Sequence, residues 1–178
     1  MDFLSMAFRS ILYILPSYFA NSIPVVLGGG APIDGKKKLA DGQRLFGDGK
    51  TVRGFFSGVA AGVVVGAIEG ALLSGTAWDI YGTGIATYVL AGFLLGLGTM
   101  AGDLLGSFIK RRQKVPQGKP SLIMDQLMFL AVAMVASYPV SSALLTPEAI
   151  VFLAVLTYFV HVGANIIAHR FGLKKVPW

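Results

Sequence analysis

The stretch that decides the fold reads GDLLGSFIKRRQKVPQGKPSLIMDQ and runs from Gly102 to Gln126. It separates two long apolar runs by a cluster of charge and a turn that contains Pro and Gly. Two acids, Asp103 and Asp125, lie near its ends, and the bases between them are Lys110, Arg111, Arg112, Lys114 and Lys119. Because most of the remaining chain is apolar, this concentration of charge predicts a connection with a function of its own.

The composition of the chain favours a bilayer as its solvent. It has 178 residues, of which 54% are hydrophobic and 13% are charged. A soluble domain carries about 25% charged residues, so this chain has too few to cover itself with a polar surface. The absence of cysteine excludes disulfides, thiolate zinc sites and cysteine nucleophiles. We therefore expect one polytopic membrane domain over residues 1–178.

Five apolar runs are long enough to cross about 30 Å of hydrocarbon, which takes roughly 20 helical residues. Only helices satisfy all their backbone groups segment by segment in lipid, so the runs predict an all-α integral membrane protein with five transmembrane helices. The acidic start and the length of the first run predict that it is not cleaved as a signal peptide. The predicted spans are Phe3–Leu27, Phe55–Leu73, Gly84–Ala101, Leu122–Leu144 and Ala149–Ala168.

The distribution of Lys and Arg predicts the orientation. Connections 74–83 and 146–148 contain no base, whereas connections 28–54 and 102–126 and the C-terminal tail are basic. By the positive-inside rule the N-terminus lies outside, the C-terminus lies in the cytoplasm, and two large loops face the cytoplasm. We expect a multi-pass protein of the cell membrane whose active site faces the cytoplasm. The bases of the first connection are Lys36, Lys37, Lys38, Arg44, Lys50 and Arg53.

Some positions within the spans predict helix packing. Small residues four apart let neighbouring helices approach closely. The sequence has such glycines at 58, 62, 66 and 70, and again at 98, 102 and 106. Arg9 and Glu69 lie in the outer halves of two spans, and because charges in lipid usually pair, we expect them to be in contact. His161, Asn165 and His169 share one helix face, and packing is favoured over a lining of the active site.

The first cytoplasmic connection reads GGGAPIDGKKKLADGQRLFGDGKTVRG over residues 28–54. Its acids Asp34, Asp41 and Asp48 each precede a glycine. Glycine-rich backbone can present amide groups to phosphate oxygens, so the segment favours a substrate-binding loop over one that only fixes topology. The GDGKT sequence is not a Walker A motif, because Arg44 stands where the motif needs its first glycine.

The second cytoplasmic connection favours phosphoryl or nucleotidyl transfer. Mg²⁺ prefers carboxylate and phosphate oxygens, and Asp103 and Asp125 could supply the carboxylates. Lys and Arg can neutralise the charge that spreads over phosphate oxygens in the transition state.

The same residues resemble a known signature. Ser107–Phe108–Ile109–Lys110–Arg111, after Gly102–Asp103 and before Asp125, resembles the S-x-x-K-R signature of the CDP-diglyceride synthases. The chain departs from it after the turn, where residues 120–124 replace a Lys-Asp pair and a His-Gly-Gly triplet, and where Gln126 replaces an arginine. The five predicted helices and the first loop are closer to the archaeal branch, the CDP-archaeol synthases.

This resemblance implies a reaction of CTP with a geranylgeranyl glycerol ether phosphate, giving a CDP-lipid and pyrophosphate with Mg²⁺ as cofactor. It implies that Asp103 and Asp125 hold the metal, and that Lys110 and Arg111 bind the CTP phosphates. Besides the bilayer, it implies these two substrates and no nucleic acid as partners. The remaining substrate contacts are expected from Asp34, Asp41, Arg44, Asp48, Lys50, Thr51, Arg53, Ser107 and Arg112.

Three alternatives remain open from the sequence. A glycerol-phosphate acyltransferase also uses glycine-rich loops, but it would leave the paired aspartates unexplained. A CDP-alcohol phosphotransferase is only partly matched by the D-G-Q-R sequence at residues 41–44. A transporter would place ionisable residues near the membrane midplane, whereas here they gather in loops at one interface.

Overall fold

The computed structural model describes residues 2–116, 119, 121 and 127–173. These residues are helical apart from loops and two isolated antiparallel bridges in the first loop. Four helices are long and apolar enough to cross a membrane, and α5 with η1 is a shorter fifth apolar element. The helices are α1 (Phe3–Leu27), α2 (Val52–Leu73), α3 (Ile85–Arg112), α5 (Met128–Ser141), η1 (Ser142–Leu144) and α6 (Pro147–Arg170).

A helix lies at the approximate position of each of the five predicted spans, although among the described residues only four are long enough to cross a membrane, and the largest difference from the prediction is at the end of α3. The prediction ended this helix at Ala101, but it continues to Arg112. Leu, Lys and Arg are good helix formers, and bases in the last turn interact favourably with the helix dipole. Asp103, Ser107 and the three bases of 110–112 therefore lie on a helix instead of in a loop. Residues 122–126 of the fourth predicted span lie outside the described residues.

The glycine pattern acts as predicted in packing α2 against α3. A Cβ on Gly62 would lie 2.5 Å from the carbonyl oxygen of Gly92 and 2.9 Å from the Cα of Gly96. On the other side of α3, a Cβ on Gly98 would lie 2.7 Å from the Cα of Ala133 in α5. Only glycine allows the backbones to approach this closely. Helix α3 is therefore held between α2 and α5.

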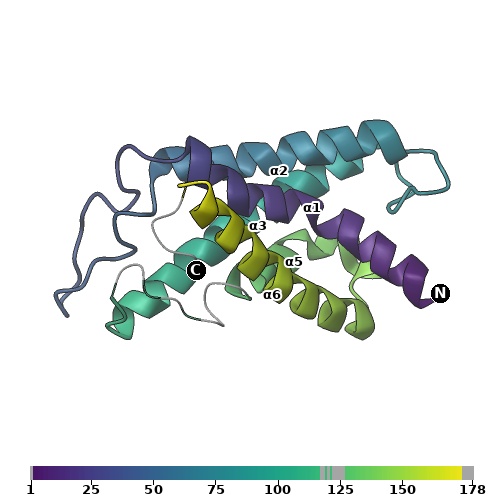
Figure 1. Cartoon of the computed structure of the whole chain (residues 1–178). Helices are drawn as coiled ribbons and strands as arrows, with labels where there is room; N and C mark the ends of the chain where they lie inside the picture. Colours follow the sequence, from purple (N-terminus) through teal and green to yellow (C-terminus); the bar gives the residue numbers. More distant parts are fainter. Residues whose placement is uncertain (1, 117–118, 120, 122–126, 174–178) are drawn as a thin grey trace.

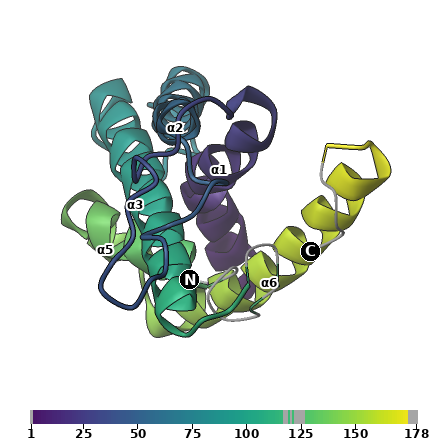
Figure 2. The same ribbon diagram turned by 90° about the vertical axis from the view of Figure 1, so that its left-hand side faces the viewer.

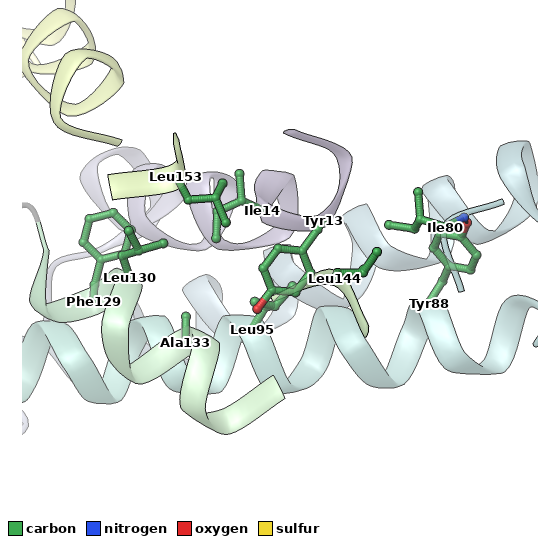
Figure 3. Close-up of a cluster of buried hydrophobic side chains, with 10 residues drawn as sticks. All are labelled: Tyr13, Ile14, Ile80, Tyr88, Leu95, Phe129, Leu130, Ala133, Leu144 and Leu153. Atoms are coloured by element: carbon green, nitrogen blue, oxygen red, sulfur yellow. The ribbon is translucent and has the colours of Figure 1, made fainter. Parts of the chain in front are cut away.

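Helix α1 is joined to the other helices by paired hydroxyl groups. The hydroxyl of Tyr13 lies 2.7 Å from Oγ of Ser137 on α5, and that of Tyr18 lies 2.9 Å from Oγ1 of Thr157 on α6. A third pair joins Ser17 to Thr99 on α3. Figure 3 shows the cluster of buried side chains, Tyr13 among them, to which α1, α3, α5 and α6 all contribute. Each pair satisfies polar groups that would otherwise be unpaired in an apolar interior.

The two ends of the molecule differ in chemistry. The first loop (residues 28–51) and the basic end of α3 lie at one end, and the N-terminus and loop 74–84 lie at the other (Figure 1). Figure 2 shows α6 diverging from α1 towards its C-terminal end. After Thr157, no residue of α6 in the described part of the chain is fully buried. His161, on this part of α6, faces the ring of Phe129, with 6.1 Å between the ring centroids.

The predicted contact between Arg9 and Glu69 is wrong. The guanidinium of Arg9 instead donates to the carbonyl oxygen of Ile80 in loop 74–84 at 2.8 Å. Glu69 is buried, and its Oε1 has no hydrogen-bond partner within the described part of the chain. The prediction rests on the similar depth of the two residues in their spans. Depth does not specify which helix face carries a residue, or which neighbour that face meets.

Loop 74–84 is organised around Asp79. Its carboxylate accepts hydrogen bonds from the N–H groups of Gly75, Tyr81 and Gly82 and from the hydroxyl of Tyr88. The backbone N–H groups of Gly75 and Gly82 make the largest contributions to lowering the pKa of Asp79 to about 2. The Asp79 carboxylate is therefore ionised at neutral pH, and both of its oxygens accept hydrogen bonds.

We expect Gly62→Val to lower the apparent melting temperature of the protein in detergent by roughly 3–10 °C, because the added side chain must push α2 away from α3. Gly163→Ala is the matched control, since a Cβ at this position on α6 meets nothing within 4 Å. Alanine there should leave the melting temperature unchanged or raise it slightly. Equal effects of the two substitutions would contradict the packing role of Gly62.

Candidate active site between the first loop and the end of α3

The first loop folds back on itself as two short paired segments. Residues 31–33 pair with 50–52 through hydrogen bonds from Ile33 N to Lys50 O at 2.8 Å and from Val52 N to Ala31 O at 3.1 Å. Further out, Lys38 and Arg44 form a second antiparallel bridge. The turn between them needs Gly42, whose φ of 75° disfavours other residues. The loop therefore has a defined shape without a regular strand.

A buried carboxylate, that of Asp34, holds this shape. Only 5% of the residue is exposed. Its oxygens accept five hydrogen bonds, two from the Arg44 guanidinium, at 2.7 and 3.2 Å, and three from backbone N–H groups. Burial raises the pKa of Asp34, but the guanidinium and the N–H groups of Phe46, Gly47 and Lys36 outweigh it and hold that pKa well below its usual range. Asp34 therefore stays ionised and ties the centre of the loop together.

The loop is attached to the last turns of α3 through Arg112. This guanidinium donates to the Asp41 carboxylate at 2.7 Å and to the carbonyl oxygen of Arg44 at 2.5 Å. It also lies over the ring of Phe108, 5.1 Å from the ring centroid. The ring of Phe46 lies 6.5 Å from that of Phe108, which adds an apolar contact between loop and helix. Sequence reasoning missed both phenylalanines, although Phe108 stands one turn before Arg112.

Lys50 and Asp103 form a second connection between the loop and α3. The ammonium Nζ of Lys50 lies 2.7 Å from Oδ1 and 2.6 Å from Oδ2 of Asp103. Lys50 precedes Thr51, whose Oγ1 accepts from Gly54 N and caps the start of α2. The helix start thus places the lysine opposite the aspartate, although 53 residues separate them in the chain.

A pocket surrounds this pair. It lies between the end of α1, the start of α2 and the middle of α3. Lys50 and Asp103 supply its charge, and the start of α2 supplies a helix N-terminus, which favours anions. The glycines in its wall carry no side chain, so backbone groups line the pocket there. The lining residues are Pro24, Gly29, Gly49, Lys50, Thr51, Gly54, Phe55, Met100, Asp103 and Leu104.

The other predicted site residues lie around this centre. Arg111 and Ser107 are buried on α3, and the Nε of Arg111 has no acceptor within the described residues. The guanidinium of Arg53 donates to the carbonyl oxygen of Gly28. Asp48 is exposed and pairs with Arg44 at 2.7 Å. Lys110 lies one position before Arg111 in the last turns of α3.

Of the two carboxylates of the predicted metal site, Asp103 lies within the described residues. Asp125 lies outside the described residues. Within the described residues no group of three metal-ligating side chains occurs. A carboxylate such as that of Asp103 suits Mg²⁺, because this ion commonly binds one or two carboxylates together with substrate phosphates.

Comparison with known proteins identifies the family. A family model described as CarS-like, CDP-archaeol synthase, matches residues 3–178. The chain belongs to this family. Among its relatives, the CDP-archaeol synthase of Pyrococcus horikoshii is 52% identical over 93% of this chain and 94% of its own length. That of Thermococcus kodakarensis is 48% identical over the whole of both chains, and that of Methanocaldococcus jannaschii is 41% identical over 99% of both.

A solved structure also resembles the chain. It is described as an intramembrane enzyme for archaeal membrane lipids biosynthesis. It matches with a TM-score of 0.74 and 36% sequence identity, over 88% of this chain and 92% of its own. The family membership and this likeness agree with the multi-pass helical architecture of the chain.

We expect Asp34→Asn to open the first loop without unfolding the helices, because it removes the charge that faces Arg44. The substitution imitates protonation of Asp34. Because the pKa of Asp34 is lowered in the folded protein, the ionised carboxylate stabilises the fold at every pH above the ordinary carboxyl pKa. This stabilisation is lost only as the pH falls through the lowered pKa. Trypsin should then cut at Lys36–Lys38 at least tenfold faster, since loss of a buried partner costs about 3–5 kcal/mol.

Asp48→Asn is the control for this experiment, because the Asp48 side chain is 62% exposed and pairs with the same arginine. It should change the rate of cleavage by less than about threefold. Equal cleavage of the two variants would contradict the central role of Asp34.

Proposed function

We propose that the chain transfers CMP from CTP to a bis-geranylgeranyl glycerol ether phosphate, giving the unsaturated CDP-archaeol and releasing pyrophosphate. The observation that supports this most is the match of residues 3–178 to the CDP-archaeol synthase family. The pocket at Lys50 and Asp103 adds chemical support, because it combines a carboxylate, an ammonium and a helix N-terminus. These groups suit a metal-bound triphosphate.

We further propose that the chain forms one domain in the cell membrane, with its N-terminus outside and its C-terminus and active site on the cytoplasmic side. The basic loop and the basic end of α3 lie at the same end of the molecule, joined by the ion pair of Arg112 and Asp41. The positive-inside rule then favours this end as cytoplasmic. This side is also where CTP is available.

In the proposed reaction, an oxygen of the lipid phosphate attacks the α-phosphorus of CTP. The bond from this phosphorus to the bridging oxygen of the β-phosphate breaks, and pyrophosphate leaves with the electron pair. Mg²⁺, when bound, would lower the cost of the negative charge on the phosphate oxygens. Asp103 and Asp125 would hold it.

The bases of the site have the task of binding and orienting the triphosphate. Lys110, Arg111 and Lys50 can neutralise phosphate oxygens, and the buried Arg111 has an N–H group without an acceptor in the described part of the chain. Buried donors of this kind interact strongly with an anion, because little solvent competes with them. Ser107, one turn before Arg111 on α3, is placed to add a hydroxyl contact.

The first loop contributes the other proposed substrate contacts. Lys50, Thr51 and Arg53 lie at the start of α2 beside the pocket, where they can face phosphate oxygens. Asp48 and Asp41 are exposed and could accept hydrogen bonds from the ribose. Asp34, Arg44 and Arg112 act on the substrate indirectly, because they hold the loop over the end of α3.

Family membership favours this function over the alternatives. An acyltransferase would need neither CTP nor a divalent cation, and a transporter would release its substrate unchanged. Incubation of the purified protein with CTP, Mg²⁺ and the lipid phosphate separates all three. Pyrophosphate and a CDP-lipid should form only when CTP, the lipid phosphate and the cation are all present.

We expect Asp103→Asn to lower kcat by about 10²–10³-fold, because loss of one group that stabilises transition-state charge has effects of this size. Lys37→Met is the control, since Lys37 is an exposed lysine of the same loop, and it should keep the rate within about twofold. Wild-type turnover by the Asp103 variant would rule out its role in metal binding. Pyrophosphate release measures both.

A further inference from the structure

Two of the acid–base pairs at the first loop, Arg44–Asp34 and Lys50–Asp103, differ in how firmly they are held. The side chain of Asp34 is fully buried, and it is fixed by backbone donors as well as by Arg44. In the pair of Lys50 and Asp103, the side chains are 28% and 34% exposed, and within the described part of the chain neither charged group makes another hydrogen bond. Solvent reaches both charged groups and screens their attraction, which it does less for a fully buried carboxylate. The first pair therefore shapes the loop, whereas the second can separate.

The geometry of the weaker pair is that of a bound cation. Nζ of Lys50 lies almost equally far from both oxygens of Asp103, at 2.7 and 2.6 Å, and so occupies the fork of the carboxylate. A metal ion bound to Asp103 would approach the same fork. The ammonium and the ion repel each other and compete for the same lone pairs.

The backbone of Lys50 is fixed by hydrogen bonds, whereas the described contacts of its side-chain ammonium are with Asp103. Its N–H donates to Gly47 O at 3.2 Å and its carbonyl oxygen accepts from Ile33 N at 2.8 Å. The four-carbon stem carries a single ammonium that can turn between acceptors, which the planar fork of an arginine does less readily. Gly49 and Gly54 line the same pocket as the Lys50 side chain.

We propose that Lys50 is an exchangeable counter-ion of Asp103. In the protein without nucleotide, its ammonium occupies the carboxylate and disfavours a bare divalent cation. When CTP arrives with its metal ion, the ion takes the carboxylate and Lys50 moves to the triphosphate oxygens. The metal thus enters with the nucleotide instead of before it. This inference rests on the proposed function, and it adds an order of binding to it.

The test is the binding of Mn²⁺ to the full-length protein in detergent without nucleotide, measured by the loss of the electron paramagnetic resonance signal of the free ion. Lys50→Met keeps the apolar stem and removes the ammonium, so it should bind Mn²⁺ about two- to fivefold more tightly than the wild type, a range set by the weakness of exposed pairs. Lys50→Arg keeps a positive charge and should not gain affinity.

Lys37→Met is the matched control, because it removes the same charge from an exposed position of the same loop. It should leave Mn²⁺ affinity unchanged, and an equal gain there would reduce the effect to net charge and overturn the proposal. In a second measurement, Lys50→Met should weaken the binding of CTP in the presence of Mg²⁺. A gain for the metal and a loss for the nucleotide is a combination that a merely structural lysine does not produce.

Asp103→Asn separates this proposal from the proposed function. If Asp103→Asn loses Mn²⁺ binding and Lys50→Met binds it as the wild type does, the exchange is wrong and the metal role of Asp103 stands. If Asp103→Asn binds Mn²⁺ as well as the wild type, both the exchange and the metal role are wrong. Melting temperatures of all variants establish that each is folded.

Discussion

The close approach of the α2 and α3 backbones is the constraint on which the rest of this structure depends. In lipid there is little hydrophobic gain from bringing two apolar helices together, so close packing has to hold them. The contact of Gly62 with Gly92 and Gly96 fixes the position of α2 along the axis of α3. With the helices antiparallel, the start of α2 then falls beside the charged half of α3. Lys50 meets Asp103 for this reason.

Charge at this end of the molecule is used in two ways. Asp34 is buried, and its carboxylate accepts hydrogen bonds from Arg44 and from backbone N–H groups, which gives the glycine-rich loop one shape. Asp103 is partly exposed and meets a single flexible ammonium. A firmly held loop beside a loosely held ion pair suits a site that must keep its form while a charged substrate enters and leaves.

Much of the helical architecture could be predicted from sequence, because the length and apolarity of a span are local properties. The end of α3 could not, since the first charged residue, Asp103, resembles the end of a span although the helix continues to Arg112. The partner of Arg9 was also beyond sequence reasoning. Its guanidinium reaches a backbone carbonyl at Ile80, and any residue type supplies such an acceptor.

Sequence by itself determined the chemistry available to this protein: a membrane environment, two acid- and base-rich connections and a family signature around Ser107 and Lys110. Only the tertiary structure decided how the acids divide their tasks. Asp34, Asp41 and Asp48 look alike in sequence, each before a glycine, yet one is buried as the centre of the loop and the others are exposed. Burial and the number of donors around a carboxylate depend on contacts between distant segments, which no local pattern specifies.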